Sequence, residues 1–238
     1  MLRIDLWRQG LTAVPAWVWQ NTDAEWLNLA DNQLRDVSPR LAQLQQLQML
    51  DLGHNELSSV PEGLAELTQL SDYLYLSDNH FRELPAWIGG LTRLRYLNIA
   101  DNELAALPDS IGELISLREL RAYNNALQVL PASVGNLMSL RELHLQGNQL
   151  EALPESIGQL RALRELSVRG CRLTSLPESM RKLASVRHLD VRANALREVP
   201  RWLADLPQLE KLDVRWNSLD GAPAWVDDLE ARGCAVLL

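Results

Sequence analysis

Residues 140–160 read LRELHLQGNQLEALPESIGQL, and the same pattern returns along the whole chain of 238 residues. The fourth letter of this stretch belongs to a series of aliphatic anchors, which stand at Ile4, Leu27, Leu50, Leu74, Leu97, Leu120, Leu143, Leu166, Leu189 and Leu212. Eight of the intervals between consecutive anchors are 23 residues long, and one is 24. A fixed period of this length predicts a solenoid of stacked units instead of a globule with one central core.

Each unit divides into a strand, a turn and a short helical segment. Apolar and polar residues alternate over 142–146, which is the signature of a short strand buried on one face. The Leu153-Pro154 step then fixes φ and removes a backbone donor, so it favours an extended or single-turn segment. Residues 155–160 leave room for one or two helical turns. Successive strands are therefore expected to stack in parallel and to line one wall.

An asparagine follows the strand in most units, at Asn32, Asn55, Asn79, Asn102, Asn125, Asn148, Asn194 and Asn217. A side-chain amide both donates and accepts hydrogen bonds, so it can satisfy backbone groups that the turn would otherwise bury unpaired. Cys171 and Gln9 hold this position in two units. We expect both replacements to be tolerated but locally weaker.

The repeated unit resembles the leucine-rich repeat, L-x-x-L-x-L-x-x-N-x-L. Its Leu-Pro-x-x-Ile-Gly form is similar to the class found in Ras-group intracellular scaffold proteins and in plant and bacterial relatives. The resemblance implies an α/β horseshoe solenoid with a parallel β-sheet on the concave face and short helical or 3-10 turns on the convex face. It also implies a single domain over residues 1–238, with about ten repeats and a closing strand near 234–238. No capping unit precedes the first strand, so the start could be natural, shielded by a partner or cut from a longer chain.

Composition and charge narrow the kinds of partner. The net charge is −8, and it is uneven: residues 1–119 carry 8 basic and 17 acidic side chains (−9), whereas residues 120–238 carry 15 and 14 (+1). Nucleic-acid binding favours the opposite balance, and we expect none. No apolar run approaches the roughly 18 residues that cross a bilayer, and nothing resembles a signal peptide, so we expect no membrane association.

The two cysteines, Cys171 and Cys234, lie about three repeats apart. At about 4.8 Å per strand that separation is roughly 14 Å, too far for a disulfide. A chain without disulfides fits a reducing compartment, and the expected location is the cytoplasm. The alternative is secretion into a host cell as an effector.

Residues that flank the buried strand positions should point into the concave space and form columns. One group of these is aromatic or sulfur-bearing and spans adjacent strands: Trp26, Met49, Tyr73, Tyr75, Tyr96 and Tyr123. Large exposed apolar side chains usually mark a contact surface, so we interpret the group as partner-binding. In the alternative interpretation, the rings stack on each other and stiffen the wall. The 24-residue unit falls here, and its extra residue would either bulge the strand and re-aim Tyr73 or be absorbed in a loop.

A second column carries Arg169, Arg192 and Arg215 beside Asp190 and Asp213. We favour an interlaced set of ion pairs on a solvated face. The alternative is a docking strip for acidic side chains or phosphate. Arg121 and His144, in the central column, complete the predicted partner-binding residues.

The sequence does not support catalysis or a metal site. His144, Ser167 and Asp190 should be neighbours, but a triad needs the imidazole between the nucleophile and the acid, and here Ser167 is in the middle. The four histidines fall in different repeats, so we expect no metal cluster among them, and without a Gly-rich phosphate loop we expect no cofactor.

The expected function is a non-catalytic protein–protein interaction module that binds a protein or peptide through its concave face. The alternative is the recognition domain of a larger bacterial effector or signalling enzyme whose catalytic part is absent from this chain. We expect a monomer, with association through the sheet edges as the alternative.

Overall fold

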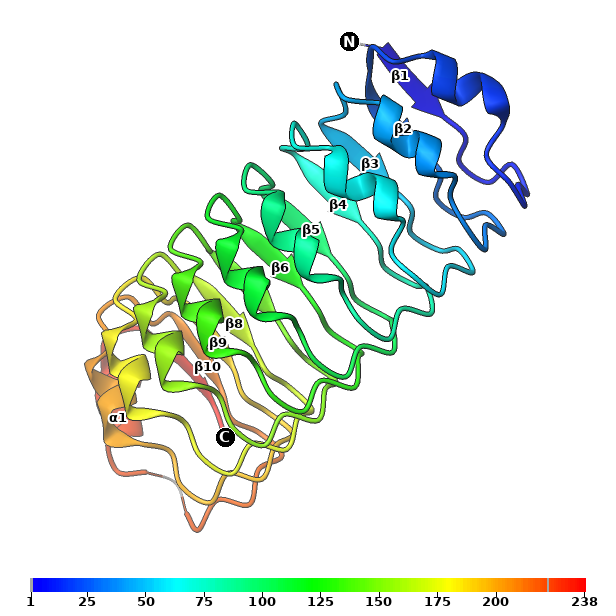
Figure 1. Ribbon diagram of the computed structural model, residues 1–238. Helices are drawn as coiled ribbons and strands as arrows, with labels where there is room; N and C mark the ends of the chain where they lie inside the picture. Colours follow the sequence, from blue (N-terminus) through cyan, green and yellow to red (C-terminus); the bar gives the residue numbers. More distant parts are fainter. Residues whose placement is uncertain (1, 222) are drawn as a thin grey trace.

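The computed structural model describes residues 2–221 and 223–238. Eleven strands form one parallel sheet in which each strand pairs with the next along the chain, so the whole molecule is an elongated, gently curved stack (Figure 1). The strands are β1 (Leu2–Asp5), β2 (Ala24–Asn28), β3 (Met49–Asp51), β4 (Tyr73–Tyr75), β5 (Tyr96–Asn98), β6 (Glu119–Arg121), β7 (Glu142–His144), β8 (Glu165–Ser167), β9 (His188–Asp190), β10 (Lys211–Asp213) and β11 (Ala235–Leu237). The anchors pair directly with each other across the sheet, for example Leu143 with Leu166.

A row of five-residue 3-10 helices runs parallel to the sheet. They are η1 (Ala16–Gln20), η2 (Pro39–Gln43), η3 (Glu62–Glu66), η4 (Ala86–Gly90), η5 (Asp109–Glu113), η6 (Ala132–Asn136), η7 (Glu155–Gln159), η8 (Glu178–Lys182) and η9 (Arg201–Asp205). A proline precedes eight of the nine, as Pro154 precedes η7 with φ −69°, and η2 instead starts with Pro39 behind a Ser38 cap. Proline sets φ and lacks an N–H that the first turn would leave unpaired, so it fits where each turn begins.

The leucines between the sheet and the helices form one continuous core. Nine of the ten anchors are no more than 1% exposed, and Ile4 is 5% exposed. The predicted horseshoe solenoid is therefore confirmed, including its closing strand: α1 (Val226–Ala231) leads into β11, which pairs with β10. Cys171 and Cys234 are both buried and unbridged. Among the described residues, the helices all lack the length and apolarity needed to span a bilayer.

The asparagines form the predicted ladder between repeats. The Asn102 amide nitrogen donates to the carbonyls of Leu76, Ile99 and Ala100 at 3.0–3.2 Å, and its oxygen accepts from the N–H of Phe81 at 3.0 Å. One side chain thus ties two adjacent repeats together. The Cys171 thiol replaces this set with weaker contacts, 3.5 Å to the carbonyl of Leu145 and 4.0 Å to that of Arg169.

Gln9 also departs from the ladder, in line with the weaker local bonding expected of its longer amide. Its side-chain nitrogen donates to the carbonyl of Trp7 at 3.2 Å, a bond confined to its own turn. Its bond to the next repeat uses the backbone instead of the side chain: the Gln9 N–H donates to the side-chain oxygen of Asn32 at 3.0 Å.

The extra residue of the 24-residue unit does not bulge the sheet. Tyr73 pairs in register with Met49 on one side and Tyr96 on the other. Instead, the segment before β4 absorbs the insertion, because Ser71 and Asp72 each accept from a different N–H of the next repeat. The loop interpretation is thus correct, and the bulge interpretation is wrong.

The 3-10 helices pack so closely that the Gly of each Ile-Gly or Val-Gly step is sterically required. A β-carbon added at Gly135 would lie 2.6 Å from the backbone oxygen of Ser156 in the next helix. Gly112 and Gly158 make the same approach to Ser133 and Ser179. These glycines set the spacing of the convex side.

Candidate functional site

The aromatic column predicted from the sequence forms a continuous surface across β2 to β5. We call Trp26, Met49, Tyr73, Tyr75 and Tyr96 the aromatic patch. Trp26, Met49, Tyr73 and Tyr96 pair in register from strand to strand, and Tyr75 lies two residues beyond Tyr73 in β4. The ring centroids of the three tyrosines are 5.0–5.9 Å apart. Such offset and tilted arrangements are the favourable geometries for aromatic pairs.

The tyrosines of the patch differ in exposure. Tyr73 is 46% exposed, whereas Tyr96 is only 9% exposed. Tyr73, Tyr75 and the guanidinium of Arg121, which lies 5.5 Å from the Tyr96 ring centroid, cover Tyr96. The expectation that Tyr96 stands open on the concave wall is therefore wrong. Burial raises the pKa of Tyr96 well above its usual range, and the Arg121 charge only partly opposes this rise. For Tyr96, the interpretation in which rings stack and stiffen the wall holds.

Two hollows flank the exposed Tyr73 ring. One, of about 270 Å³, is lined by Trp26, Met49, Tyr73 and Tyr75, together with polar residues that include Glu25 and Arg3. The other, of about 350 Å³, is lined by Asp72, Tyr73, Arg95, Tyr96, Arg118 and Glu119. A ridge between two hollows of this size is suited to side chains of a bound segment that fall on either side of Tyr73. Tyr123, which follows β6, is half-buried and makes no ring contact with described tyrosines.

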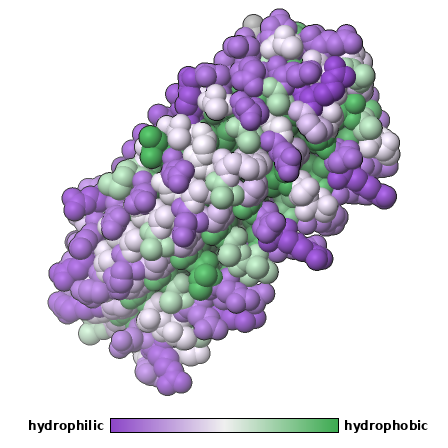
Figure 2. Space-filling view, viewed as in Figure 1, coloured by the Kyte–Doolittle hydropathy of each residue, from purple (hydrophilic) through white to green (hydrophobic). Residues whose placement is uncertain are grey.

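The remaining exposed hydrophobic side chains are scattered. Figure 2 shows hydrophilic side chains over most of one face, with hydrophobic residues in a broken line along the long axis. Away from the strands, Ile115 and Met138 hold the same position in consecutive repeats and are 60% and 57% exposed. They are the natural comparison for the aromatic patch, because they are apolar and exposed but lie off the sheet.

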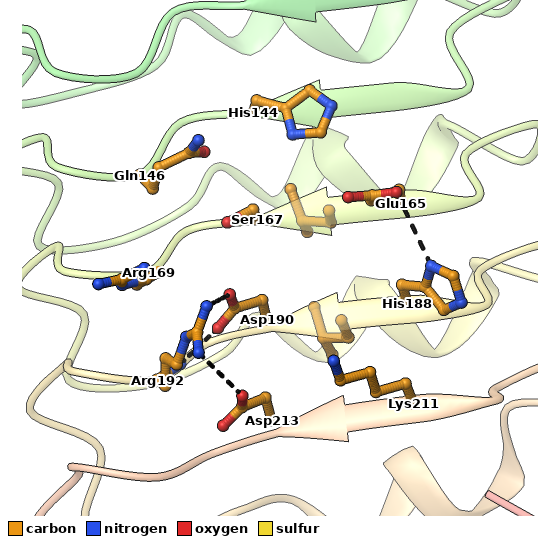
Figure 3. A pocket seen from close by; sticks show the side chains of 12 residues that line it. His144, Gln146, Glu165, Ser167, Arg169, His188, Asp190, Arg192, Lys211 and Asp213 are labelled. Atoms are coloured by element: carbon orange, nitrogen blue, oxygen red, sulfur yellow. Dashed lines mark hydrogen bonds and ion pairs between the residues drawn. The ribbon is translucent and has the colours of Figure 1, made fainter. Parts of the chain in front are cut away.

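Two of the three arginines in the column, Arg192 and Arg215, form ion pairs within the chain, and Figure 3 shows those of Arg192. Arg215 donates two hydrogen bonds to the carboxylate of Asp213, at 3.0 and 2.7 Å. Arg192 lies between Asp190, at 3.1 Å, and Asp213, at 3.4 Å. Burial alone would raise the pKa of Asp213, but the Arg215 hydrogen bonds and the charges of both arginines outweigh it and lower that pKa. The predicted ion-pair network is present for Arg192 and Arg215.

Arg169 differs from the other two arginines of its column. Its side chain is exposed, and within residues 2–221 and 223–238 it has no ion-pair partner. It borders a polar hollow of about 360 Å³ that sequence reasoning missed, together with His144, Ser167, His188, Asp190 and Lys211. These residues come from four different strands, β7 to β10, and their shared position follows only from the register.

The structure has the order predicted from the sequence, His144, Ser167, Asp190, which does not form a catalytic triad. His144 pairs with Ser167 across β7 and β8, and Ser167 pairs with Asp190 across β8 and β9 (Figure 3). The imidazole therefore lies at one end of the row, where its Nε2 is 3.4 Å from Glu142. This geometry does not relay a proton from Ser167 through a histidine to an acid.

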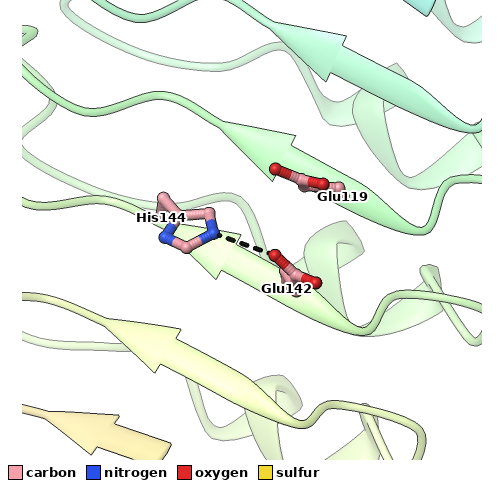
Figure 4. A group of neighbouring side chains, drawn as sticks. All are labelled: Glu119, Glu142 and His144. Carbon is pink, nitrogen blue, oxygen red and sulfur yellow. Dashed lines mark hydrogen bonds and ion pairs between the residues drawn. The ribbon is translucent and has the colours of Figure 1, made fainter.

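One group of side chains has a composition suited to a metal ion. The ligand atoms of Glu119, Glu142 and His144 lie within 4.8 Å of each other on β6 and β7 (Figure 4). Two carboxylates and an imidazole could hold a divalent cation. However, the Nε of Arg121 is 2.6 Å from Glu119 and already supplies a positive charge there. The spacing of the histidines does not reveal this group, because two of its three ligands are carboxylates.

Comparisons with known proteins agree with this architecture. The model of a leucine-rich repeat region matches residues 72–147 and 132–231, and that of a leucine rich repeat matches residues 22–81. A search of curated protein sequences gives no significant match.

Among solved structures, a leucine-rich repeat protein of Leptospira interrogans is 26% identical, with 96% of this chain and 70% of that one covered and a TM-score of 0.59. The ectodomain of the receptor kinase GASSHO1/SCHENGEN3 from Arabidopsis thaliana, in complex with CASPARIAN STRIP INTEGRITY FACTOR 2, is 28% identical, with coverage of 92% and 27% and a TM-score of 0.82. The Arabidopsis receptor kinase HAESA, in complex with the peptide hormone IDA and the co-receptor SERK1, is 27% identical, with coverage of 92% and 38% and a TM-score of 0.80.

The chain thus spans less than two fifths of these two receptor structures. The family models together extend over residues 22–231, where the strands, the asparagine ladder and the 3-10 helices repeat. This protein belongs to the leucine-rich repeat family.

Proposed function

We propose that this protein is a non-catalytic interaction module that binds an extended segment of a protein partner across the aromatic patch on its concave face. The observation that carries the proposal is Tyr73, a residue that is 46% exposed on the sheet and has a hollow on each side. Aromatic residues held in place by neighbours supply much of the binding energy at protein interfaces. Tyr75 and Tyr96 hold the Tyr73 ring in this way.

The comparisons support the general class of partner. The GASSHO1/SCHENGEN3 and HAESA structures are complexes, the latter with a peptide hormone, and both are more than 25% identical to this chain. The open geometry also favours binding over catalysis. The polar hollow of β7 to β10 lies on the face of a sheet, and its imidazole and hydroxyl are not arranged as a base and a nucleophile.

A peptide selection tests the proposal. Random 12-residue peptides displayed on phage are selected on the immobilised wild-type protein, and the affinity of each selected peptide is measured in solution. We expect the double variant Trp26→Ala/Tyr73→Ala to bind these peptides at least about tenfold more weakly, as for the loss of interface hot spots. Its melting temperature should stay close to that of the wild type, because Trp26 is only half-buried and Tyr73 is exposed.

The matched control is Ile115→Ala/Met138→Ala, which removes two exposed apolar side chains away from the sheet. This variant should bind the peptides like the wild type. Equal affinity for the wild type and the Trp26→Ala/Tyr73→Ala variant would show that the patch is not the binding surface.

A further inference from the structure

Four aspartates hold the same position in the central column of the sheet and make the same local turn. Asp5, Asp51, Asp190 and Asp213 each accept a hydrogen bond from the backbone N–H two residues further on, at 3.2, 2.8, 3.2 and 3.3 Å. The turn does not need a carboxylate, because Asn28 and Asn98 make it in their repeats with amide oxygens, at 3.0 and 3.1 Å. The negative charge of these aspartates must therefore be explained by something other than the turn.

For two of the aspartates, the explanation lies two residues further along the chain. Arg192 follows Asp190 and lies 3.1 Å from its carboxylate, and Arg215 follows Asp213 and lies 2.7 Å from its carboxylate. Each charge is thus neutralised from the same turn. In the C-terminal repeats the chain supplies both members of the pair.

Asp51 has the carboxylate without the cation. Asp5 likewise has no cation two positions on, but it is exposed on the edge strand β1, whereas Asp51 is half-buried. The residue two positions on is Gly53, which has no side chain. Within residues 2–221 and 223–238, no basic side chain forms an ion pair with Asp51. The nearby imidazole of His54 is paired with Asp78. Burial raises the pKa of Asp51, and the Gly53 hydrogen bond and the His54 charge only partly offset this. A half-buried carboxylate is left facing the concave space at an energetic cost.

The surroundings of Asp51 fit a planar cation. Asp51 pairs in register with Tyr75, whose ring belongs to the aromatic patch. Arg121 already shows how a guanidinium lies on this cluster, because it lies 5.5 Å from the ring centroid of Tyr96. The positions on either side of Gly53 in its column are also small, Ala30 and Ser77. The place that Arg192 and Arg215 fill in their repeats is therefore lined by small side chains near Asp51.

The charge of this half of the molecule favours a basic occupant. Residues 1–119 carry 8 basic and 17 acidic side chains, a net charge of −9. We propose that a basic side chain of the bound segment occupies the space over Gly53, pairs with Asp51 and lies against the ring of Tyr75. This inference rests on the proposed function, and it adds the chemistry of one partner side chain. Guanidinium is the better fit, because its plane can both pair with a carboxylate and stack on an aromatic ring.

A double-mutant cycle between the protein and a selected peptide tests the inference. Peptides selected on the wild type should share an arginine or lysine at one position. Synthetic peptides then carry the neutral counterpart at that position, citrulline for arginine or norleucine for lysine. We expect this change to weaken binding to the wild type by about tenfold, as for loss of a charge-assisted pair. The Asp51→Asn variant keeps the turn, as Asn28 does, and should bind the two peptides equally.

The control Asp109→Asn removes one negative charge from η5, on the convex side, and should leave the tenfold difference intact. Two results would overturn the inference while leaving the proposed function standing. The first is selected peptides that need Trp26 and Tyr73 but share no basic residue. The second is a tenfold loss that persists in Asp51→Asn. Peptides that bind the Trp26→Ala/Tyr73→Ala variant as tightly as the wild type would overturn both proposals.

Discussion

Arg215, two residues after Asp213, donates two hydrogen bonds to its carboxylate, at 3.0 and 2.7 Å. Asp213 is only 2% exposed, so the pair joins a buried acid to a base at the surface of the sheet. Because the folded state lowers the pKa of Asp213, the unfolded state binds protons more readily than the folded state in the acid range.

This relationship predicts part of the acid sensitivity of the protein. The stabilisation from Asp213 is fully present above its unfolded pKa of about 3.9, and is lost as the pH falls through the lower folded value. We expect the free energy of unfolding of the wild type to fall more steeply below about pH 4 than that of Asp213→Asn, whose side chain does not titrate. Urea unfolding between pH 5 and pH 2.5 measures the difference. Parallel curves for the two proteins would contradict it.

The cysteine in the asparagine ladder predicts a stabilising substitution. Cys171→Asn should restore the short hydrogen bonds that Asn148 and Asn194 make in the adjacent repeats, and raise the free energy of unfolding by roughly 1 kcal/mol. The reciprocal variant, Asn194→Cys, should lower it by a similar amount. Urea unfolding at neutral pH checks both. A destabilised Cys171→Asn would mean that the thiol is packed better than its long contacts suggest.

Substitution of two glycines on the convex side should affect stability differently. Gly135→Ala places a methyl group 2.6 Å from the Ser156 oxygen and should cost roughly 1–3 kcal/mol by overpacking. Gly90→Ala is the control, because an added β-carbon there meets nothing within 4 Å. It should change stability by no more than about 0.5 kcal/mol. Thermal unfolding separates the two, and equal melting temperatures would show that neighbouring 3-10 helices can move apart freely.

Truncation of the buried and of the exposed tyrosine in the aromatic patch should lower stability by different amounts. Tyr96→Ala removes a nearly buried ring beneath Tyr73 and Tyr75, and we expect it to cost roughly 2–4 kcal/mol. Tyr73→Ala removes an exposed ring, and should cost less than about 1 kcal/mol. Chemical unfolding of the two variants, compared with the wild type, measures this difference. If Tyr73→Ala is the more destabilising of the two, the assignment of Tyr73 to binding and Tyr96 to support is wrong.

The repeat made the backbone predictable. A 23-residue period fixes the register of Leu143 against Leu166, the turn at Asn148 and the 3-10 helix after Pro154, because identical units can stack only with equivalent positions side by side. The pairing of Arg192 with Asp213 of the next strand also followed from register, since neighbouring strands lie about 4.8 Å apart.

The details of the site were less predictable, because they depend on side-chain packing between strands. The pattern that places Tyr73 and Tyr96 in one column does not reveal that Arg121 and two rings cover Tyr96. It also does not show where an extra residue is absorbed, since a loop and a bulge satisfy the same spacing. The group of Glu119, Glu142 and His144 arises from two columns and two repeats together. A search through single residue types could not find it.

The thiol of Cys171 interrupts the series of asparagine hydrogen bonds that link neighbouring repeats. Asn148 makes such bonds on one side of it and Asn194 on the other. Because each repeat contacts only its neighbours, the array should unfold first at its weakest interface between repeats. We expect the repeats of β9 to β11, with their arginine–aspartate pairs, to unfold as a unit while the aromatic patch on β2 to β5 stays folded. The proposed binding surface would then remain folded after the C-terminal repeats have unfolded.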